Sequence, residues 1–180
     1  MAGIRRIVTG HSDDGASCIV EDGPSPHRRV REATGLVVTD LWRTTAAPAT
    51  PTPHDDGCSG PYELAPPRGG TVVRVVEFPP DRNWLGRVGV DDLRFEGDES
   101  AREAFTGNAA RPDMHRTSSV DYAIVLDGEI VAVLERDETT MHPGDVLVQC
   151  ATVHAWSNRT DRPCSVAFVL VDADVGAHAP

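Results

Sequence analysis

His154-Ala155-Trp156-Ser157-Asn158 begins ten residues after the glycine of the turn Pro143-Gly144-Asp145, and the pattern around these segments decides the fold. Between them runs Val146-Leu147-Val148-Gln149, which we expect to be a short buried strand. Upstream, His115-Arg116-Thr117-Ser118-Ser119-Val120-Asp121 leads into Tyr122-Ala123-Ile124-Val125-Leu126-Asp127-Gly128-Glu129. Strands that carry a histidine, or a histidine and an acid, therefore alternate with glycine turns. This order is typical of a small β-barrel that gathers metal ligands at its centre.

The surrounding sequence supports an all-β protein. From Met114 to Ala173 candidate strands alternate with turns about every ten residues, and no long amphipathic helix interrupts them. Thr71–Phe78 is a further strand, stopped by Pro79-Pro80. No internal repeat is present, so the pattern predicts one antiparallel barrel or sandwich.

The first 70 residues predict strands and then a loop. Residues 4–9 and 16–20 are β-rich and flank Asp14-Gly15, which indicates a hairpin. Residues 35–42 form another β-branched run, whereas residues 44–70 contain six prolines and predict an irregular surface loop.

Residues 81–112 are less regular. Residues 98–105 predict one or two helical turns, ended by Gly107-Asn108. Two interpretations stay open for the segment: a lid over the mouth of the barrel, or a solvated surface loop.

The two polar segments resemble the two sequence motifs of the cupin family. In the first motif, His115 stands at the first histidine, Thr117 at the second and Asp121 at the glutamate, seven residues before Gly128. In the second motif, Gly144-Asp145 opens the segment, and His154-x-x-x-Asn158 matches its histidine and asparagine. Gln149-Cys150-Ala151 replaces the Pro-x-Gly that often precedes that histidine.

The resemblance implies a single cupin barrel (a double-stranded β-helix, or jelly roll) with an N-terminal β extension. We expect residues 1–70 to form the extension and the proline-rich loop, residues 71–173 the barrel, and residues 174–180 a tail.

The resemblance also implies a metal site at His115, Asp121 and His154. Alternate residues of a strand share a face, so His115, Thr117 and Asp121 would point inward together if no bulge intervenes. Two imidazoles and one carboxylate suit Fe(II), with Zn(II), Mn(II) and Ni(II) as alternatives. Thr117 replaces a histidine of the family's usual three-histidine, one-glutamate site, and the aspartate is shorter than a glutamate. The alternative is a metal-free pocket in which these side chains form a polar cluster capable of acid–base chemistry.

Asp121 and His154 are the candidate catalytic residues, and Trp156, Thr117 and Tyr122 the candidate substrate contacts. By alternation Trp156 shares the face of His154, so it is the better candidate to form a pocket wall, although it could equally be a core residue. Tyr122 takes the face opposite Asp121. We expect Arg116 on the outer face and Asn158 in a turn, so neither should contact the substrate.

We therefore predict a small metal-dependent enzyme that acts on a small cyclic or aromatic oxygenated metabolite. The metal would serve as a Lewis acid for a dehydratase, isomerase, cyclase or decarboxylase, of the kind that similar stand-alone cupins supply in secondary metabolism. An Fe(II)-dependent dioxygenase is one alternative and a non-catalytic small-molecule-binding module another. A sugar-nucleotide isomerase is less favoured, because residues 114–172 contain four arginines and no lysine.

Composition limits the remaining possibilities. A net charge of −11 over 180 residues argues against nucleic-acid binding, which needs clustered positive charge. The four cysteines have no CxxC spacing, and neither a signal peptide nor a membrane-spanning run is evident. We therefore expect a cytoplasmic protein with a small-molecule substrate and no membrane partner. We also expect a homodimer in which residues 1–43 reach the partner.

Overall fold

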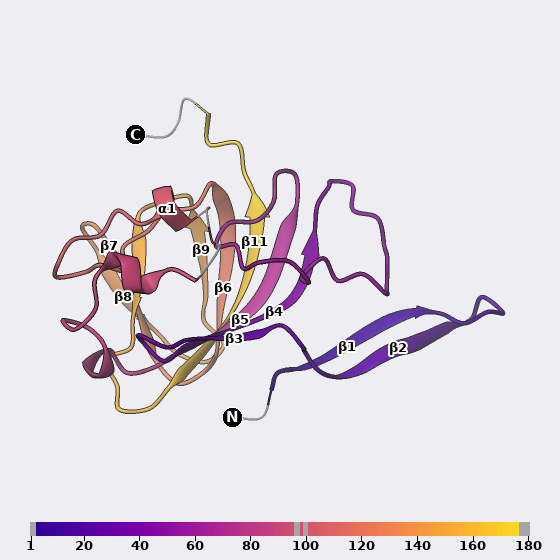
Figure 1. The fold of residues 1–180 in the computed structure, drawn as a ribbon, viewed down its shortest axis with the longest axis horizontal. Coiled ribbons are helices and arrows are strands. Elements are labelled where there is room, and N and C mark those ends of the chain that lie inside the picture. Colours follow the sequence, from indigo (N-terminus) through magenta and orange to yellow (C-terminus); the bar gives the residue numbers. More distant parts are fainter. Residues whose placement is uncertain (1–2, 96–97, 99–100, 177–180) are drawn as a thin grey trace.

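Two facing β-sheets form the body of the protein, and a long hairpin projects from it (Figure 1). The computed structural model describes residues 3–95, 98 and 101–176. The expected all-β architecture is confirmed, since all long elements of the described residues are strands and their pairings are antiparallel.

The larger sheet has six strands. Its order is β3 (Arg28–Arg31), β4 (Leu36–Thr44), β5 (Thr71–Phe78), β11 (Cys164–Asp172), β6 (Ser119–Asp127) and β9 (Val146–Cys150). β4 pairs with β5 along most of its length, which joins residues 28–44 to the same sheet as the later strands. The sheet therefore begins before residue 71, where we expected the barrel to start.

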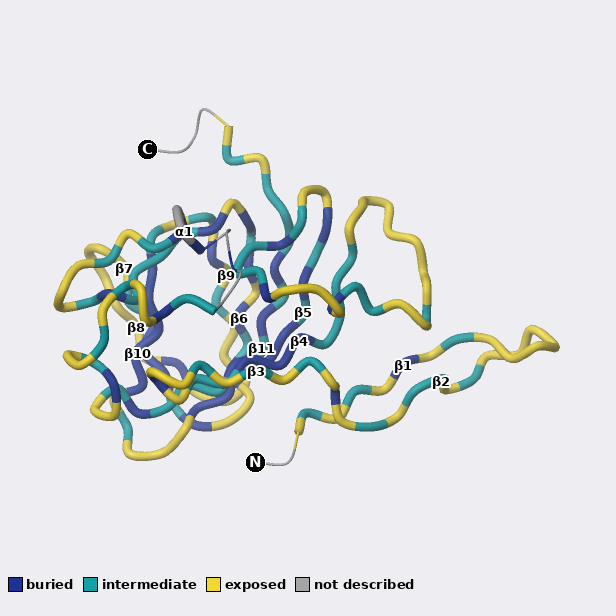
Figure 2. Tube along the Cα trace, in the orientation of Figure 1, coloured by how far each residue is buried: buried dark blue, intermediate teal, exposed yellow. Residues whose placement is uncertain are grey.

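The smaller sheet has three strands in the order β10 (His154–Ser157), β7 (Ile130–Leu134) and β8 (Glu138–Met141). Isolated bridges from Phe105 to His115 and from His115 to His154 extend it beyond β10. Apolar side chains of both sheets, among them Val72, Val125, Ile130 and Val166, meet between them and form the core. In Figure 2 the buried stretches accordingly follow the strands of the barrel.

The strand at residues 146–149 is confirmed, but it is not fully buried as expected. β9 lies at the edge of the larger sheet, paired with β6 alone. Gln149 is buried, whereas Val146 and Val148 are 56% and 54% exposed on the outer face. A strand with one covered face alternates in burial even when its sequence is uniformly apolar.

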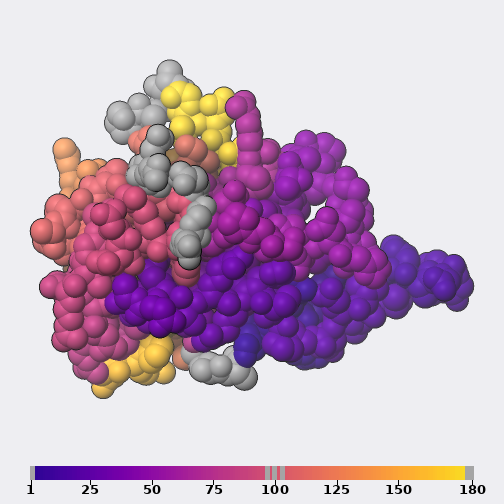
Figure 3. All heavy atoms as spheres, in the orientation of Figure 1, coloured from indigo at the N-terminus to yellow at the C-terminus, as the bar shows by residue number. Residues whose placement is uncertain are grey.

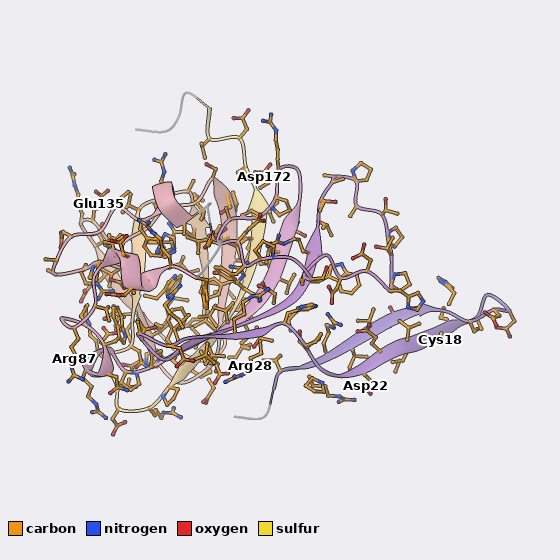
Figure 4. The ribbon with its side chains drawn as sticks, viewed as in Figure 1. Cys18, Asp22, Arg28, Arg87, Glu135 and Asp172 are labelled. Atoms are coloured by element: carbon orange, nitrogen blue, oxygen red, sulfur yellow. The ribbon has the colours of Figure 1, made fainter. Side chains whose placement is uncertain are left out.

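The predicted N-terminal hairpin is confirmed as β1 (Arg5–His11) paired with β2 (Ser17–Pro24). It extends away from the barrel, with Cys18 and Asp22 far from the two facing sheets (Figure 4). At its base, the Arg6 guanidinium donates hydrogen bonds to the Leu41 carbonyl at 3.1 Å and to Asp56. These bonds fix the direction in which the hairpin leaves the barrel.

Irregular segments make up much of the remaining chain. Residues 45–70 contain no strand, as expected for the proline-rich loop. Residues 81–112 contain η1 (Asp81–Asn83), η2 (Val90–Leu93) and α1 (Ala101–Ala104). The helical turns expected over residues 98–105 fall partly outside the described residues, at 99–100, as does the end of the tail, at 177–180. No helix in the described part of the chain has the length and apolarity needed to cross a membrane.

Candidate functional site

A pocket lies between the two sheets, and most of the predicted site residues line it. His115, Thr117, Asp121, His154 and Trp156 all contribute to its wall. Their inward direction agrees with the alternation expected along the strands. The remaining wall is largely apolar, with Leu36, Val38, Leu64, Val76, Phe78, Leu93, Phe168 and Leu170 among its residues.

His115 and His154 form a close pair. Their backbones exchange two hydrogen bonds of 2.9 Å, and their ring centroids are 4.3 Å apart. Nδ1 of His115 lies 2.8 Å from the Asp113 carbonyl, and Nδ1 of His154 lies 3.0 Å from the Thr152 carbonyl. A carbonyl oxygen only accepts hydrogen bonds, so each Nδ1 carries the proton and each Nε2 presents a lone pair.

Both imidazoles of this pair are held neutral. Burial and, to a smaller extent, the neighbouring His115 together lower the pKa of His154 to about 3, although the Thr152 carbonyl opposes them. Burial also lowers the pKa of His115, an effect that the Asp113 carbonyl opposes and the Arg31 cation strengthens. The pair therefore presents two hydrogen-bond acceptors to a ligand at neutral pH.

Asp121 occupies a different part of the pocket wall. Burial raises the pKa of its carboxyl to about 6, although the Ser119 hydroxyl, the Arg74 cation and the Thr117 hydroxyl lower it. Neither histidine is among the groups that shift this pKa. One carboxylate oxygen, Oδ1, is buried and accepts no hydrogen bond from the described part of the chain. A buried oxygen without a partner is costly, and it is available to a proton or to a ligand donor.

The separation of Asp121 from the histidines has a local cause. We expected residues 115–121 to form one strand, but regular pairing is interrupted at residues 116–118. His115 pairs with His154 and so belongs to the smaller sheet, whereas Asp121 pairs with Leu170 and Gln149 in the larger sheet. The chain thus crosses from one sheet to the other between the two predicted ligands.

The predicted three-ligand metal site is therefore not formed. Among the described residues, no group of three or more histidine, cysteine, aspartate or glutamate side chains is placed to hold a metal ion. The histidine pair has one property of a metal site, because each ring donates its other N–H to a carbonyl. It lacks a third protein ligand, since Thr117 stands where the family has a histidine and its hydroxyl is hydrogen-bonded to Ser119 at 2.7 Å. The donor set does not fit the facial triad that we expected.

Tyr122, which we expected among the substrate contacts, lies outside the pocket. It is 42% exposed and does not line the pocket, because it alternates with the inward-facing Asp121 and Ala123. Asn158 holds a turn, as expected: its amide nitrogen donates to the carbonyls of Phe78 and Arg162, each at 2.8 Å.

Six polar residues of the pocket wall were not predicted from the sequence: Arg31, Thr34, Tyr62, Arg74, Asp81 and Asp113. Arg74 is buried at 3% exposure, and its Nε lies 3.0 Å from Asp40 Oδ1. Arg74 lies on the same face of β5 as the buried Val72 and Val76. The alternation of residues along this strand could therefore have indicated that Arg74 points inward. Tyr62 lies in the proline-rich loop, where no periodicity is available.

The 81–112 segment closes one side of the pocket. Asp81, Trp84, Leu93 and Phe105 line it, and Trp84 and Leu93 are buried. Of the two interpretations left open, a covering segment agrees better with this placement than a solvated loop.

Comparison with known proteins shows which proteins this chain resembles. Residues 103–171 match the family model of the cupin domain. The chain is 27% identical over 190 aligned positions to the cupin-domain-containing oxidoreductase fogC of Aspergillus ruber, covering 97% of this chain and 76% of the relative. It is 47% identical over 62 residues, 33% of each chain, to phomopsin biosynthesis cluster protein C' of Diaporthe leptostromiformis. Among solved structures, the cupin domain of Schizosaccharomyces pombe Cnp3 is similar with a TM-score of 0.45 and 12% identity, covering 96% of this chain and 88% of that one. Residues 103–171 of this chain thus match the cupin domain, and the all-β fold agrees with that match.

Proposed function

We propose that this protein is an enzyme of secondary metabolism that binds a small cyclic or aromatic oxygenated compound in the barrel pocket. We further propose that Asp121 moves a proton in a reaction of the isomerase type. The biosynthetic role of the phomopsin-cluster relative supports the metabolic setting. The observation that carries the chemistry is the buried Asp121 carboxyl, which lines a largely apolar pocket and whose Oδ1 has no hydrogen-bond partner among the described residues.

The proposed step needs no oxidant. Asp121 takes a proton from the carbon next to a ligand carbonyl, and the bond electrons form the enolate. The same carboxyl then returns the proton to a different atom of the ligand. A carboxyl with a pKa of about 6 can serve as base and then as acid near neutral pH. The neutral His115 and His154 would accept hydrogen bonds from hydroxyl groups of the ligand.

An oxidoreductase is the second candidate, because the relative from Aspergillus ruber carries that name. Such a reaction needs a redox partner. We draw no step through a metal, since the described donor set does not fit the expected site. A non-catalytic binding module is the third possibility, and the experiment below separates it from an enzyme.

Deuterium exchange tests the proposed proton transfer. The probes are 1-indanone and 1-tetralone, two cyclic aryl ketones, followed by proton NMR in deuterated buffer. We expect the wild-type protein to accelerate exchange next to the carbonyl, and Asp121→Asn to slow it by about 100-fold. Asp127→Asn, an exposed carboxyl on the same strand, is the matched control and should retain the wild-type rate.

Two results would contradict the proposal. Equal exchange rates in wild type and Asp121→Asn would remove Asp121 from the chemistry. Ketone binding without any accelerated exchange would instead support a binding module.

We also propose that the working unit is a cytoplasmic homodimer. All four cysteines are free thiols, as is usual in a reducing compartment. The projecting hairpin offers a surface for a second copy.

A further inference from the structure

Arg31 is the last residue of β3 and lines the pocket. Its guanidinium carbon lies 4.7 Å from the centroid of the Phe95 ring, so the cation stacks on that ring. Phe95 in turn packs against Tyr62, with ring centroids 4.5 Å apart. Figure 3 shows the chain around residue 30 beside the segment that follows residue 81, the two segments that meet at this contact. Arg31 is thus held in place by aromatic packing, and the Asp98 carboxylate acts on it electrostatically.

The guanidinium of Arg31 lines the pocket and forms no hydrogen bond and no salt bridge with the described residues. Arg74, the other arginine of the pocket wall, has both hydrogen-bond and ion-pair partners. Arg74 donates to the Tyr62 hydroxyl at 2.7 Å and to the Glu63 carbonyl at 2.9 Å, and it pairs with Asp40 at 3.0 Å. Of these two arginines, one therefore has its donors engaged by the protein and the other has them available.

A largely desolvated guanidinium whose N–H donors are not engaged is unfavourable, and neither stacking on an aromatic ring nor the charge of Asp98 satisfies those donors. Its planar fork of N–H donors matches the two oxygens of a carboxylate. The Tyr62 hydroxyl lies on the same wall. Its oxygen accepts a hydrogen bond from Arg74, which leaves its proton free to donate to a ligand oxygen.

We propose that the pocket binds compounds with a carboxylate at one end of a flat apolar body, and that Arg31 recognises that carboxylate. This inference rests on the proposed function, because it names the class of compound that the same pocket takes. The apolar residues Leu36, Leu93 and Phe105 line the pocket with Arg31 and would contact the uncharged part of the ligand. Arg31 is a binding residue in this scheme and takes no part in proton transfer.

Calorimetric titration with matched ligand pairs tests the inference. The pairs are benzoate with benzamide, phenylacetate with phenylacetamide, and cinnamate with cinnamamide, which keep shape and remove charge. We expect the wild-type protein to bind at least one carboxylate about tenfold or more tightly than its amide. Arg31→Gln should abolish this preference, and Arg31→Lys should retain part of it because the charge remains while the fork is lost.

Arg28→Gln is the control variant. Arg28 lies on the same strand, its side chain is exposed and it does not line the pocket (Figure 4). The ratio of carboxylate to amide affinity is internal to each variant, so a general loss of stability would not imitate the expected result.

The inference is wrong if no carboxylate binds more tightly than its amide to the wild-type protein, or if Arg31→Gln keeps the wild-type ratio. Neither outcome would bear on the proposed proton transfer, because that proposal is tested by whether deuterium exchange slows in Asp121→Asn. Conversely, an Arg31-dependent carboxylate preference without any Asp121-dependent exchange would support this inference and overturn the proposed reaction.

Discussion

Asp121 and His154 have pKa values displaced in opposite directions from their ordinary values, and both displacements disfavour charge in the barrel. The carboxyl moves up from 3.8 to about 6, and the imidazole moves down from 6.5 to about 3. Because the carboxyl has a higher pKa in the folded than in the unfolded protein, the folded protein binds more protons. The contribution of Asp121 to the free energy of unfolding therefore declines as pH rises from about 4 to about 6. The lowered pKa of His154 has the opposite effect. Its contribution to the free energy of unfolding declines as pH falls from 6.5 towards 3.

Single substitutions should separate these two opposed effects. We expect Asp121→Asn to remove the carboxyl's contribution, so that the free energy of unfolding rises more steeply between pH 4 and 6 than in the wild type. At pH 7 the variant should be more stable by up to roughly 3 kcal/mol. His154→Gln should change the slope in the opposite sense. Urea unfolding at a series of pH values measures both. Identical slopes in Asp121→Asn and wild type would show that burial does not penalise this carboxylate.

Thr117 is the residue at which this chain departs most from the family's ligand pattern. We expect the wild-type protein to hold well below one zinc ion per chain after loading and desalting, because two histidines without a third protein ligand bind weakly. Thr117→His adds an imidazole on the same pocket wall and should raise zinc content towards one ion per chain. Mass spectrometry of the metal content measures it.

Ser118→His is the matched control, because Ser118 neighbours Thr117 but is exposed. Equal zinc content in both variants would show that residue 117 does not face the histidine pair. A full equivalent of zinc in the wild type that disappears in His154→Ala would instead restore the metal site that we first expected.

We expect the buried ion pair of Asp40 and Arg74, which joins β4 to β5, to contribute more to the free energy of unfolding than a partly exposed ion pair does. Asp40 and Arg74 are 3% exposed each. Arg74→Met leaves Asp40 buried without its cation and should lower the free energy of unfolding by roughly 3 to 5 kcal/mol. Arg74→Met combined with Asp40→Asn should recover part of that loss. Arg43→Met removes a pair with the half-exposed Glu63 and should cost about 1 kcal/mol or less. Similar losses in both single variants would mean that burial is not the deciding factor.

The strands and their inward faces could be predicted from the sequence, whereas the position of one element relative to another could not. Alternation placed Thr117, Asp121, His154 and Trp156 on the inner wall because each lies in or beside a regular strand. The expectation of one continuous strand failed at residues 116–118, where the chain passes from one sheet to the other without any glycine or proline to mark the bend. The proline-rich loop was recognised, but its Tyr62 reaches the pocket through long-range packing that no local pattern encodes.

At the scale of the whole molecule, we predict that two exposed apolar surfaces meet in the proposed homodimer. The hairpin carries Ile7 and Ile19, which are 49% and 60% exposed, and the outer face of β6 and β9 carries Tyr122, Val146 and Val148. We expect the hairpin of one copy to pack on this outer face of a second copy, which would also cover the edge strand β9.

Light scattering coupled to size-exclusion chromatography tests this arrangement. Ile19→Asp and Val148→Asp should each convert dimer to monomer, because each places a charge in the interface, with little change in melting temperature. Glu135→Arg, in an exposed turn of the smaller sheet, should leave the dimer intact (Figure 4). A wild-type monomer, or a dimer that survives both aspartate variants, would contradict the arrangement.

The crossing between His115 and Ser119 also has an evolutionary consequence. Only three residues join the histidine-bearing sheet to the carboxylate-bearing sheet at this point. Lengthening or shortening that connection by one residue would move the imidazoles relative to the carboxylate, while the pairing of both sheets stayed as it is. Descendants of one ancestral barrel could therefore gain or lose a metal through small insertions there, long before their cores had diverged.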